Sequence, residues 1–274
     1  MMAAGSVDQC SSCPLYNPTV SSILHIQYTY NNLRIIIVLT CIFAIISLLL
    51  APFLHKHNSV MSPASKRGLC WPTSNVDPVH TFTKPGSRIS WYYNWAPDPA
   101  KDASSIDFVP MAWNNVHIDQ LESKIKDANA TSMLAFNEPE LPDQSHMPAE
   151  LAASEWLRCI EPLRKSGIRC GSPGISSAPQ GVTWLQDFLR RIREGGSDVD
   201  FLAMHWYGVE LGQFYDYIWS TRHQLDASKP VWITEFASTN WNKENPLPKE
   251  HVEKFAMDST KYLDTLDWVE RYAW

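Results

Sequence analysis

From residue 68 onward the chain alternates short apolar segments with longer amphipathic ones, and this alternation constrains the fold more than any other feature. The apolar segments are rich in β-branched and aromatic residues, which favour strands. Eight predicted strands cover residues 68–71, 88–95, 107–113, 132–137, 168–173, 200–207, 230–236 and 269–274. Five predicted helices cover residues 118–128, 148–166, 183–194, 211–227 and 249–263. The first two connections are rich in proline and favour no helix.

The predicted strands indicate a parallel sheet that is buried on both faces. Residues 201–207 (FLAMHWY) and 231–236 (VWITEF) are apolar almost throughout. Eight strand–helix steps fit a small (β/α)8 barrel, also called a TIM barrel. A doubly wound open sheet is the alternative, but no glycine-rich phosphate-binding loop follows any predicted strand. Because the last predicted strand reaches Trp274, we expect a barrel that is truncated after strand eight.

Residues 35–54 are the strongest candidate for a membrane span. They carry no formal charge, and a helix of this length is about 30 Å long, which matches the hydrocarbon core of a bilayer. We expect one transmembrane helix here. A signal peptide is the alternative, although such peptides usually begin closer to the N-terminus. The segment separates a polar tail from a linker and a folded domain, at residues 1–34, 55–66 and 67–274.

Composition excludes several classes of protein. Lys and Arg number 23 against 29 Asp and Glu, and a net charge of −6 does not fit nucleic-acid binding, which depends on clustered cations. The apolar content of 45% excludes a disordered chain, and six cysteines are too few for a small disulfide scaffold. Twelve Trp, ten Tyr and ten Phe suit either a large core or a surface that stacks on sugar rings.

Two glutamates at predicted strand ends are the candidates for catalysis. Glu138 follows the fourth predicted strand, and Glu235 lies near the end of the seventh. The C-terminal ends of barrel strands meet at one face, where a carboxylate is costly to bury without partners. Hydrolysis of a glycosidic bond needs one carboxylic acid to protonate the leaving oxygen, and one carboxylate to attack the anomeric carbon or activate water. A salt bridge at the barrel rim is the structural alternative.

Seven motifs resemble, in order, those of one family. They are residues 67–72 (RGLCWP), 91–95 (WYYNW), 136–140 (FNEPE), 170–173 (CGSP), 204–207 (MHWY), 232–236 (WITEF) and 270–274 (ERYAW). Together they resemble the fungal glycosyl hydrolase catalytic core group, glycoside hydrolase family 128, of the alkali-sensitive-linkage type. The resemblance covers residues 67–274. It implies a barrel enzyme that hydrolyses β-1,3-glucan in endo mode with retention of configuration.

The resemblance also implies roles for individual residues. By motif match, Glu138 is the acid/base and Glu235 the nucleophile. Asn137 would bind the sugar 2-hydroxyl. His205 and Tyr207 share one strand face, so one or both could orient Glu235. The candidate sugar platforms are aromatic residues near strand ends, with core packing as the alternative: Trp95, Trp113, Trp206, Trp241 and Trp274.

We predict no metal and no cofactor. No second histidine lies at ligand spacing on the strand of His205, and acid–base hydrolysis needs no cofactor. We expect a monomer that acts on β-glucan polysaccharide and is held to a membrane through residues 35–54, with the domain facing the cell wall, or secreted if that segment is cleaved. The positive flanks of the segment favour the opposite orientation. The alternative functions are a non-catalytic glucan-binding surface protein, and another β-glycanase or transglycosylase of the same barrel clan.

Some polar residues fall outside this predicted site. Asn129-Ala130-Thr131 is the one N-glycosylation sequon, because Pro18 excludes the one at Asn17. It precedes the fourth predicted strand, at the barrel end opposite the glutamates, and matters only in a lumenal domain. We expect Glu140, Asp143 and Glu150 to be solvated charges, and Cys159 and Cys170 to be free thiols rather than a disulfide.

Overall fold

The computed structural model describes residues 65–75, 77–101 and 106–274, and all eight predicted strands occur in it. They are β1 (Arg67–Cys70), β2 (Ile89–Tyr93), β3 (Asp107–Phe108), β4 (Ser132–Met133), β5 (Arg169–Cys170), β6 (Leu202–Gly208), β7 (Val231–Ser238) and β8 (Val269–Ala273). The predicted tail, the predicted membrane span at residues 35–54 and most of the linker lie outside the described residues. Within the described residues, no helix is long and apolar enough to cross a bilayer.

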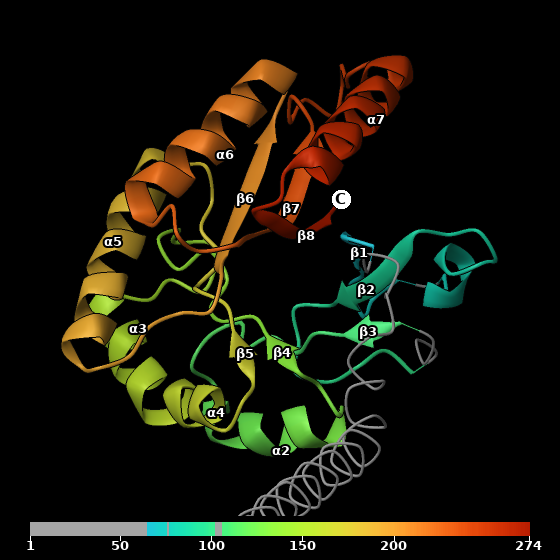
Figure 1. Cartoon of the computed structure of the whole chain (residues 1–274). Coiled ribbons are helices and arrows are strands. Elements are labelled where there is room, and N and C mark those ends of the chain that lie inside the picture. Colours follow the sequence, from blue (N-terminus) through green and yellow to red (C-terminus); the bar gives the residue numbers. More distant parts are fainter. Residues whose placement is uncertain (1–64, 76, 102–105) are drawn as a thin grey trace, which may run out of the picture. The chain divides into compact units, whose positions relative to one another are not determined.

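The strand pairings are all parallel and run in a ring. Six strands form one sheet in the order β3-β2-β1-β8-β7-β6, and β4 pairs with β5. Two isolated bridges, Met111–Leu134 and Gly171–Phe201, join the β4–β5 pair to the strands on either side. Each strand therefore neighbours the next in sequence, and β8 returns to β1, as in a TIM-barrel-like domain (Figure 1).

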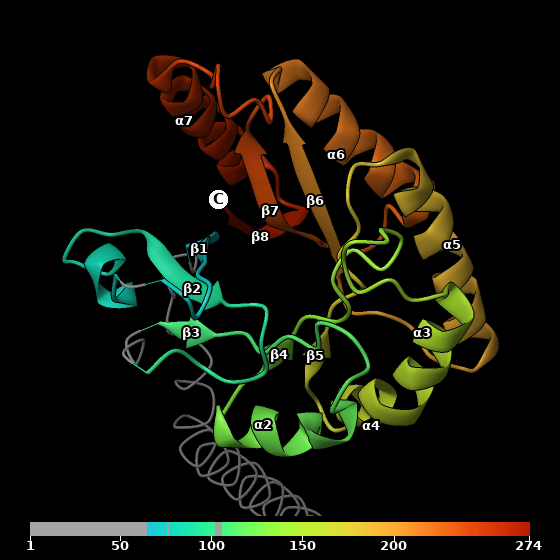
Figure 2. The same ribbon diagram turned by 180° about the vertical axis from the view of Figure 1, so that it is seen from behind.

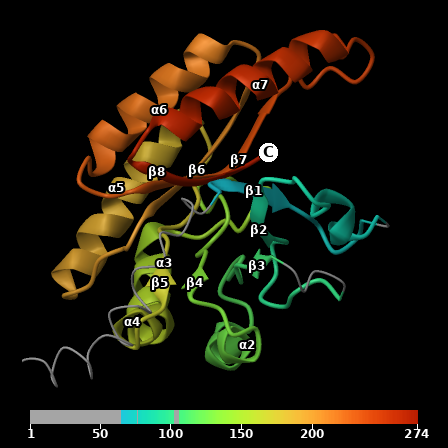
Figure 3. The ribbon, with the colours of Figure 1, turned by 45° about the vertical axis from the view of Figure 1, so that its right-hand side comes forward.

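Helices cover the outside of much of this ring (Figures 1 and 2). They are α2 (Leu121–Asp127), α3 (Ala149–Glu155), α4 (Glu161–Lys165), α5 (Pro179–Glu194), α6 (Leu211–Leu225) and α7 (Lys249–Thr265). A π-helical turn, Trp156–Ile160, joins α3 to α4, so the predicted helix at 148–166 is not a uniform α-helix. Figure 3 shows α6 and α7 over the outer side of β6, β7 and β8.

The outer side of β1, β2 and β3 is different, because no α-helix of the described chain covers it (Figure 2). A single 3-10 turn, η1 (Val79–Phe82), lies there, and Val79 and Tyr92 form a small core with partly buried Phe108. Proline lacks a backbone N–H and disfavours helix interiors. The proline-rich connections around residues 72–100 therefore give an irregular cover in place of helices, as predicted.

Alternation along the strands divides the core into two layers. Inside the ring, large aromatic side chains fill the barrel, and the rings of Phe201 and Trp232 stack at 3.9 Å. A larger apolar layer lies between the strands and the helices. Side chains that follow one another on a strand belong to opposite layers. Whether a side chain reaches the barrel interior therefore depends on whether its position on the strand faces inward or outward.

The middle strands are much shorter than predicted. β3, β4 and β5 have two residues each, where the predicted ranges were 107–113, 132–137 and 168–173. Beyond them, pairing continues only at single bridges such as Asn137–Gly174. Apolar character correctly predicted that these segments are buried. It carries no information on where a continuous ladder ends, because ladder pairing depends on the neighbouring strand.

Gly171 offers a test of the packing inside the ring. An added β-carbon there would lie 2.3 Å from Cε2 of the buried Phe201 ring, so Gly171→Ala should lower the free energy of unfolding by about 1–3 kcal/mol. Gly212 on α6 is the matched control, because nothing lies within 4 Å of its added β-carbon. Gly212→Ala should cause no loss. Denaturant unfolding measures both, and equal stability of the two variants would contradict this packing.

Candidate active site

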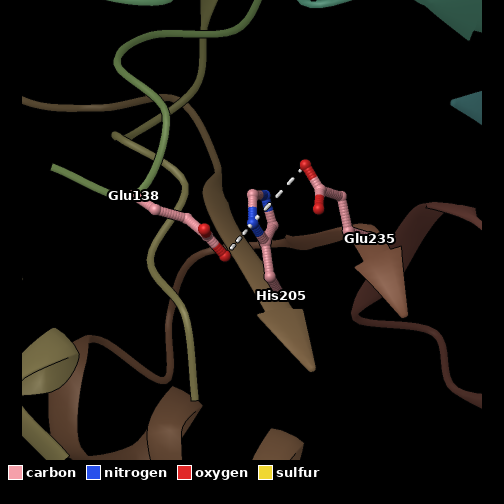
Figure 4. A group of neighbouring side chains, drawn as sticks. All are labelled: Glu138, His205 and Glu235. Atoms are coloured by element: carbon pink, nitrogen blue, oxygen red, sulfur yellow. Dashed lines mark hydrogen bonds and ion pairs between the residues drawn. The ribbon is translucent and has the colours of Figure 1, made fainter. Parts of the chain in front are cut away.

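Three buried side chains meet at the C-terminal end of the strand ring (Figure 4). Glu138 follows β4, His205 lies on β6 and Glu235 on β7. His205 Nδ1 lies 2.9 Å from Glu138 Oε1 and 3.6 Å from Glu235 Oε1. One oxygen of each glutamate and one nitrogen of the histidine all lie within 4.8 Å of one another. The fold thus brings together two carboxylates that are almost a hundred residues apart in sequence.

Glu138 has an unusual backbone conformation that a neighbouring loop supports. Its φ is 40°, in the left-handed region that costs a non-glycine residue about 1–2 kcal/mol. Its backbone N–H donates to the Gly174 carbonyl at 2.7 Å. An added β-carbon at Gly174 would lie 2.8 Å from His205 Nε2, so this loop packs directly on the imidazole. The loop after β5 therefore supports Glu138 and His205 together.

Glu235 accepts hydrogen bonds from three side chains. Tyr93 Oη and Trp95 Nε1 donate to its Oε1 at 2.9 and 2.8 Å, and Tyr207 Oη donates to its Oε2 at 2.8 Å. Burial and the Glu235 carboxylate raise the pKa of Tyr207 well above its usual value, so the hydroxyl keeps its proton. Donors of this kind stabilise negative charge on a carboxylate. The surroundings of Glu235 therefore suit a group that acts in its ionised form.

The backbone next to Glu235 is also held in place. Cys70 Sγ donates to the Thr234 carbonyl at 3.0 Å, and Tyr93 Oη lies 3.2 Å from the same oxygen. Neither Cys70 nor Tyr93 was among the predicted site residues. A signal for Tyr93 was present, because it shares a strand face with Trp95. The contact made by Cys70 depends on β7 and had no signal in the sequence.

Two opposing effects set the pKa of the fully buried His205. Burial lowers the pKa because an imidazolium loses its hydration, whereas the carboxylates of Glu235 and Glu138 raise it, and the net result is a pKa above 6.5. Nε2 of His205 has no hydrogen-bond partner among the described residues. A proton on His205 offsets the repulsion between the two carboxylates, which could not otherwise be buried this close together at low cost.

Asn137 presents a free acceptor beside Glu138. Its side chain is 2% exposed, and Nδ2 donates to Gln144 Oε1 at 3.0 Å. Oδ1 is buried without a partner among the described residues. A buried acceptor without a partner costs about 1–3 kcal/mol. This oxygen is therefore ready to accept a hydrogen bond from a bound molecule.

Two of the five predicted aromatic residues, Trp95 and Trp241, contact residues of the site, and a third, Trp113, lines a separate pocket. Trp95 contacts Glu235 as described above. Trp241 is 73% exposed, and its ring lies 5.3 Å from that of Tyr207. Trp113 follows β3 and lines a pocket of about 310 Å³. These positions are compatible with sugar contact.

Trp206 and Trp274 do not point into the site, which corrects their predicted role as sugar platforms. Trp206 is 5% exposed and stacks on Phe255 of α7 at 5.6 Å. Trp274 is 40% exposed and packs edge-on against Phe236 on the outer side of β7. For Trp206 the reason is strand alternation: His205 points into the barrel, so Trp206, the next residue on the strand, points outward.

Glu140 is a second correction, because it is not a solvated charge. It is half-buried, and its Oε1 accepts a hydrogen bond from the Ser176 backbone N–H at 2.7 Å. Burial raises the pKa of Glu140 above its usual value. Glu140 therefore ties the loop that carries Glu138 to the loop after β5. Asp143 and Glu150 are exposed, as predicted.

The remaining cysteines agree with prediction. Cys159 and Cys170 are free thiols, as is Cys70. Burial raises the pKa of the Cys170 thiol well above its usual value, so it remains a protonated packing group.

Glu138, His205 and Glu235 are also the group in the described chain whose ligand atoms could hold a metal ion. An imidazole and two carboxylates are ligands that several divalent metals accept. A cation would have to displace the hydrogen bonds that Glu235 accepts and the contact between His205 and Glu138. The prediction of no metal is tested by chelation below.

The two carboxylates should determine the titration of His205. We expect its pKa in the folded protein to lie above 6.5, and to fall in Glu138→Gln and in Glu235→Gln because burial then acts with less opposition. NMR titration of the imidazole, assigned with His205→Gln, measures this. Because the folded pKa is raised, the stability that His205 contributes is fully present below about pH 6.5 and is lost as the pH rises through the folded pKa. A pKa at or below 6.5 would contradict this electrostatic picture.

The chain matches a known family model over nearly all of its described part. The model described as glycosyl hydrolase catalytic core matches residues 68–274. Among curated proteins, alkali-sensitive linkage protein 1 of Schizosaccharomyces pombe is 34% identical over 217 residues, which are 78% of this chain and 39% of that protein. The chain thus spans well under half the length of this relative.

Solved structures of similar fold carry the same family assignment. A family 128 subgroup III curdlan-specific exo-β-1,3-glucanase from Blastomyces gilchristii is 31% identical with a TM-score of 0.67, over 77% of this chain and 90% of that one. A subgroup I endo-β-1,3-glucanase from Amycolatopsis mediterranei, in complex with laminaritriose, is 30% identical with a TM-score of 0.63, over 77% and 88%. These matches confirm the resemblance seen in the motifs. This chain belongs to the glycosyl hydrolase catalytic core family, glycoside hydrolase family 128.

Proposed function

We propose that residues 67–274 hydrolyse β-1,3-glucan with retention of configuration. The observation that supports retention is the spacing of the two glutamates, whose nearest oxygens lie within 4.8 Å of each other. Retaining glycosidases hold their carboxyl groups about 5–5.5 Å apart, whereas inverting enzymes leave about 6.5–9.5 Å for a water molecule. The two relatives described above are β-1,3-glucanases, which supports the choice of substrate.

The hydrogen bonds favour one assignment of the two roles. Glu235 accepts bonds from three donors, so it is suited to remain an anion and to attack the anomeric carbon. Glu138 lacks this set of donors and has His205 as its one side-chain hydrogen-bond partner, so we assign it the acid/base role, which the motif match also implies. The free Oδ1 of Asn137 would accept a hydrogen bond from the sugar 2-hydroxyl, which strengthens in the transition state.

The reaction then has two steps. In the first, a Glu235 oxygen forms a bond to the anomeric carbon while the bond to the leaving oxygen breaks, and Glu138 gives its proton to that oxygen. In the second, Glu138 takes a proton from water, and the water oxygen displaces Glu235 from the same carbon. Two inversions at one carbon give net retention.

We further propose that the enzyme acts in endo mode. In the ring of strands, β3 and β7 lie across from each other. Trp113 follows β3 and the exposed Trp241 follows β7, so an aromatic side chain that could stack on a sugar ring follows a strand on each side of the catalytic pair. A site that holds the polymer on both sides of the scissile bond cuts within the chain. An exo-acting enzyme would instead release small sugars from one end.

The place of action is also a proposal. A polymeric wall glucan lies outside the cytosol, so we propose that residues 67–274 face the cell exterior, either anchored through residues 35–54 or released after cleavage. We propose β-glucan polysaccharide as the partner of a monomeric domain.

The decisive experiment follows the first product formed from a β-1,3-gluco-oligosaccharide by NMR. We expect a β-anomer from the full chain, and a loss of activity of about 10²–10⁴-fold in Glu138→Gln and in Glu235→Gln. A chelator should leave the rate unchanged. Early release of mixed oligosaccharides would support endo action, whereas glucose alone would indicate exo action. Folded protein that binds glucan without turnover would support a glucan-binding surface protein instead.

Added azide separates the two roles. In Glu235→Gly, azide can take the place of the nucleophile and react once, which gives an α-glycosyl azide. In Glu138→Ala, azide attacks the glycosyl-enzyme intermediate, which gives a β-glycosyl azide. The opposite pattern would exchange the assignments of the two glutamates.

A larger oligosaccharide as the main product would indicate a transglycosylase of the same clan.

Glu140→Ala should lower kcat several-fold with little change in KM, because it leaves the Ser176 N–H unbonded and frees the loop that carries Glu138. Glu140→Gln keeps an oxygen acceptor and should retain most activity. Glu150→Ala removes an exposed carboxylate of the next helix and is the matched control. Steady-state kinetics on folded variants tests this, and equal rates for Glu140→Ala and Glu150→Ala would exclude the role.

A further inference from the structure

A groove lies on the outer side of the barrel, where no α-helix of the described residues covers β2 and β3. Its volume is about 530 Å³. Its lining includes Ile106 and Phe108, together with residues 127–131, which run from the last residue of α2 to the residue before β4. This side of a (β/α)8 barrel is normally covered by a helix. The groove is thus a partly apolar surface with a free side chain of the sequon, Asn129, at its edge.

The structure leaves Asn129 available for modification. Asn129 is exposed, with φ 50°, and its backbone N–H donates to Lys126 O at 3.0 Å. The Ala130 N–H donates to Ile125 O at 3.0 Å, so backbone bonds alone close the turn. The side-chain amide of Asn129 makes no hydrogen bond to the described residues, and Thr131 is exposed. A group attached to the amide therefore displaces no contact of the fold.

The position is also far from the proposed chemistry. Asn129 precedes β4, whereas Glu138 follows it, so the two lie at opposite ends of the barrel strands. All strands are parallel, and the substrate-facing side chains lie at the other end of every strand. An attached group at Asn129 leaves the mouth of the site open.

We propose that Asn129 carries an N-linked oligosaccharide whose first N-acetylglucosamine residue covers this groove. The amide nitrogen of Asn129 forms a bond to the anomeric carbon of a lipid-pyrophosphate-linked oligosaccharide. The bond from that carbon to the pyrophosphate oxygen breaks, the lipid pyrophosphate leaves with the electron pair, and the amide loses one proton. The apolar face of the sugar would pack on Phe108, and Asp127 and Lys101 line the groove within reach of its polar groups.

This modification would also determine on which side of a membrane the domain lies. The transfer takes place only in the lumen of the secretory pathway, so a glycan at Asn129 requires that residues 67–274 cross the membrane during synthesis. The charges that flank residues 35–54 favour the opposite orientation. The glycan is therefore a direct measure of topology and does not depend on catalytic turnover.

The test is expression of the full chain in eukaryotic cells that add N-glycans, followed by endoglycosidase H. We expect a mobility shift on digestion, and no shift for Asn129→Gln or Thr131→Ala. Thr131→Ser keeps the sequon and should keep the shift. Because the chain has no second sequon, the result is unambiguous. A full chain without the shift, or a shift that persists in Asn129→Gln, would overturn the proposal.

Melting temperatures test whether the first N-acetylglucosamine packs in the groove. Endoglycosidase H leaves one N-acetylglucosamine on the asparagine, so the trimmed Thr131→Ser protein should melt close to the fully glycosylated one, and Thr131→Ala should melt lower. Equal melting temperatures of trimmed Thr131→Ser and Thr131→Ala would show that the first sugar projects into solvent, and would overturn the proposal that it packs in the groove. Glucan hydrolysis by the same samples reports on the proposed function separately.

Discussion

The close approach of two buried carboxylates is the constraint on which the rest of this site depends. Glu138 and Glu235 bring oxygens within 4.8 Å of each other, and like charges at that distance repel strongly in a medium of low dielectric. His205 lies between them and offsets the repulsion when it is protonated, because the two carboxylates raise its pKa against the opposing effect of burial. Tyr93, Trp95 and Tyr207 then stabilise the charge on one partner only. The two glutamates have the same side chain, and the different hydrogen-bond partners around them make their environments different.

The strand ring makes this arrangement possible. Parallel strands bring their C-terminal ends to one face, so residues on β2, β6 and β7 meet the residue that follows β4, although all are far apart in sequence. Alternation sends one side chain inward and the next into the layer under the helices. Large aromatic residues pack together inside the ring, and such close packing resists strand movement and so helps to keep the carboxylates in place. Packing therefore maintains the spacing on which a retaining mechanism depends.

Much of this was predictable from particular residues. Local composition and order predict the eight strands and the positions of Glu138 and Glu235 at strand ends. They also predict the lack of an α-helix among the described residues of the first two connections. Predictions that depended on a side chain's direction were less successful. Trp206 was predicted as a sugar platform from its position at a strand end, but it belongs to the outer layer. Glu140 was predicted to be solvated, yet it bonds a loop that only the fold brings near.

By itself, the sequence determined the fold class, the family and the two carboxylates, because apolar periodicity and ordered motifs are properties of the chain read along its length. The tertiary structure decided what those groups can do. Contacts between distant segments produce all of these features: the hydrogen bonds to Glu235, the position of His205 between the glutamates, the free oxygen of Asn137 and the groove beside Asn129. Such contacts depend on strand register and loop path, and these are set by packing across the whole barrel rather than by local preference.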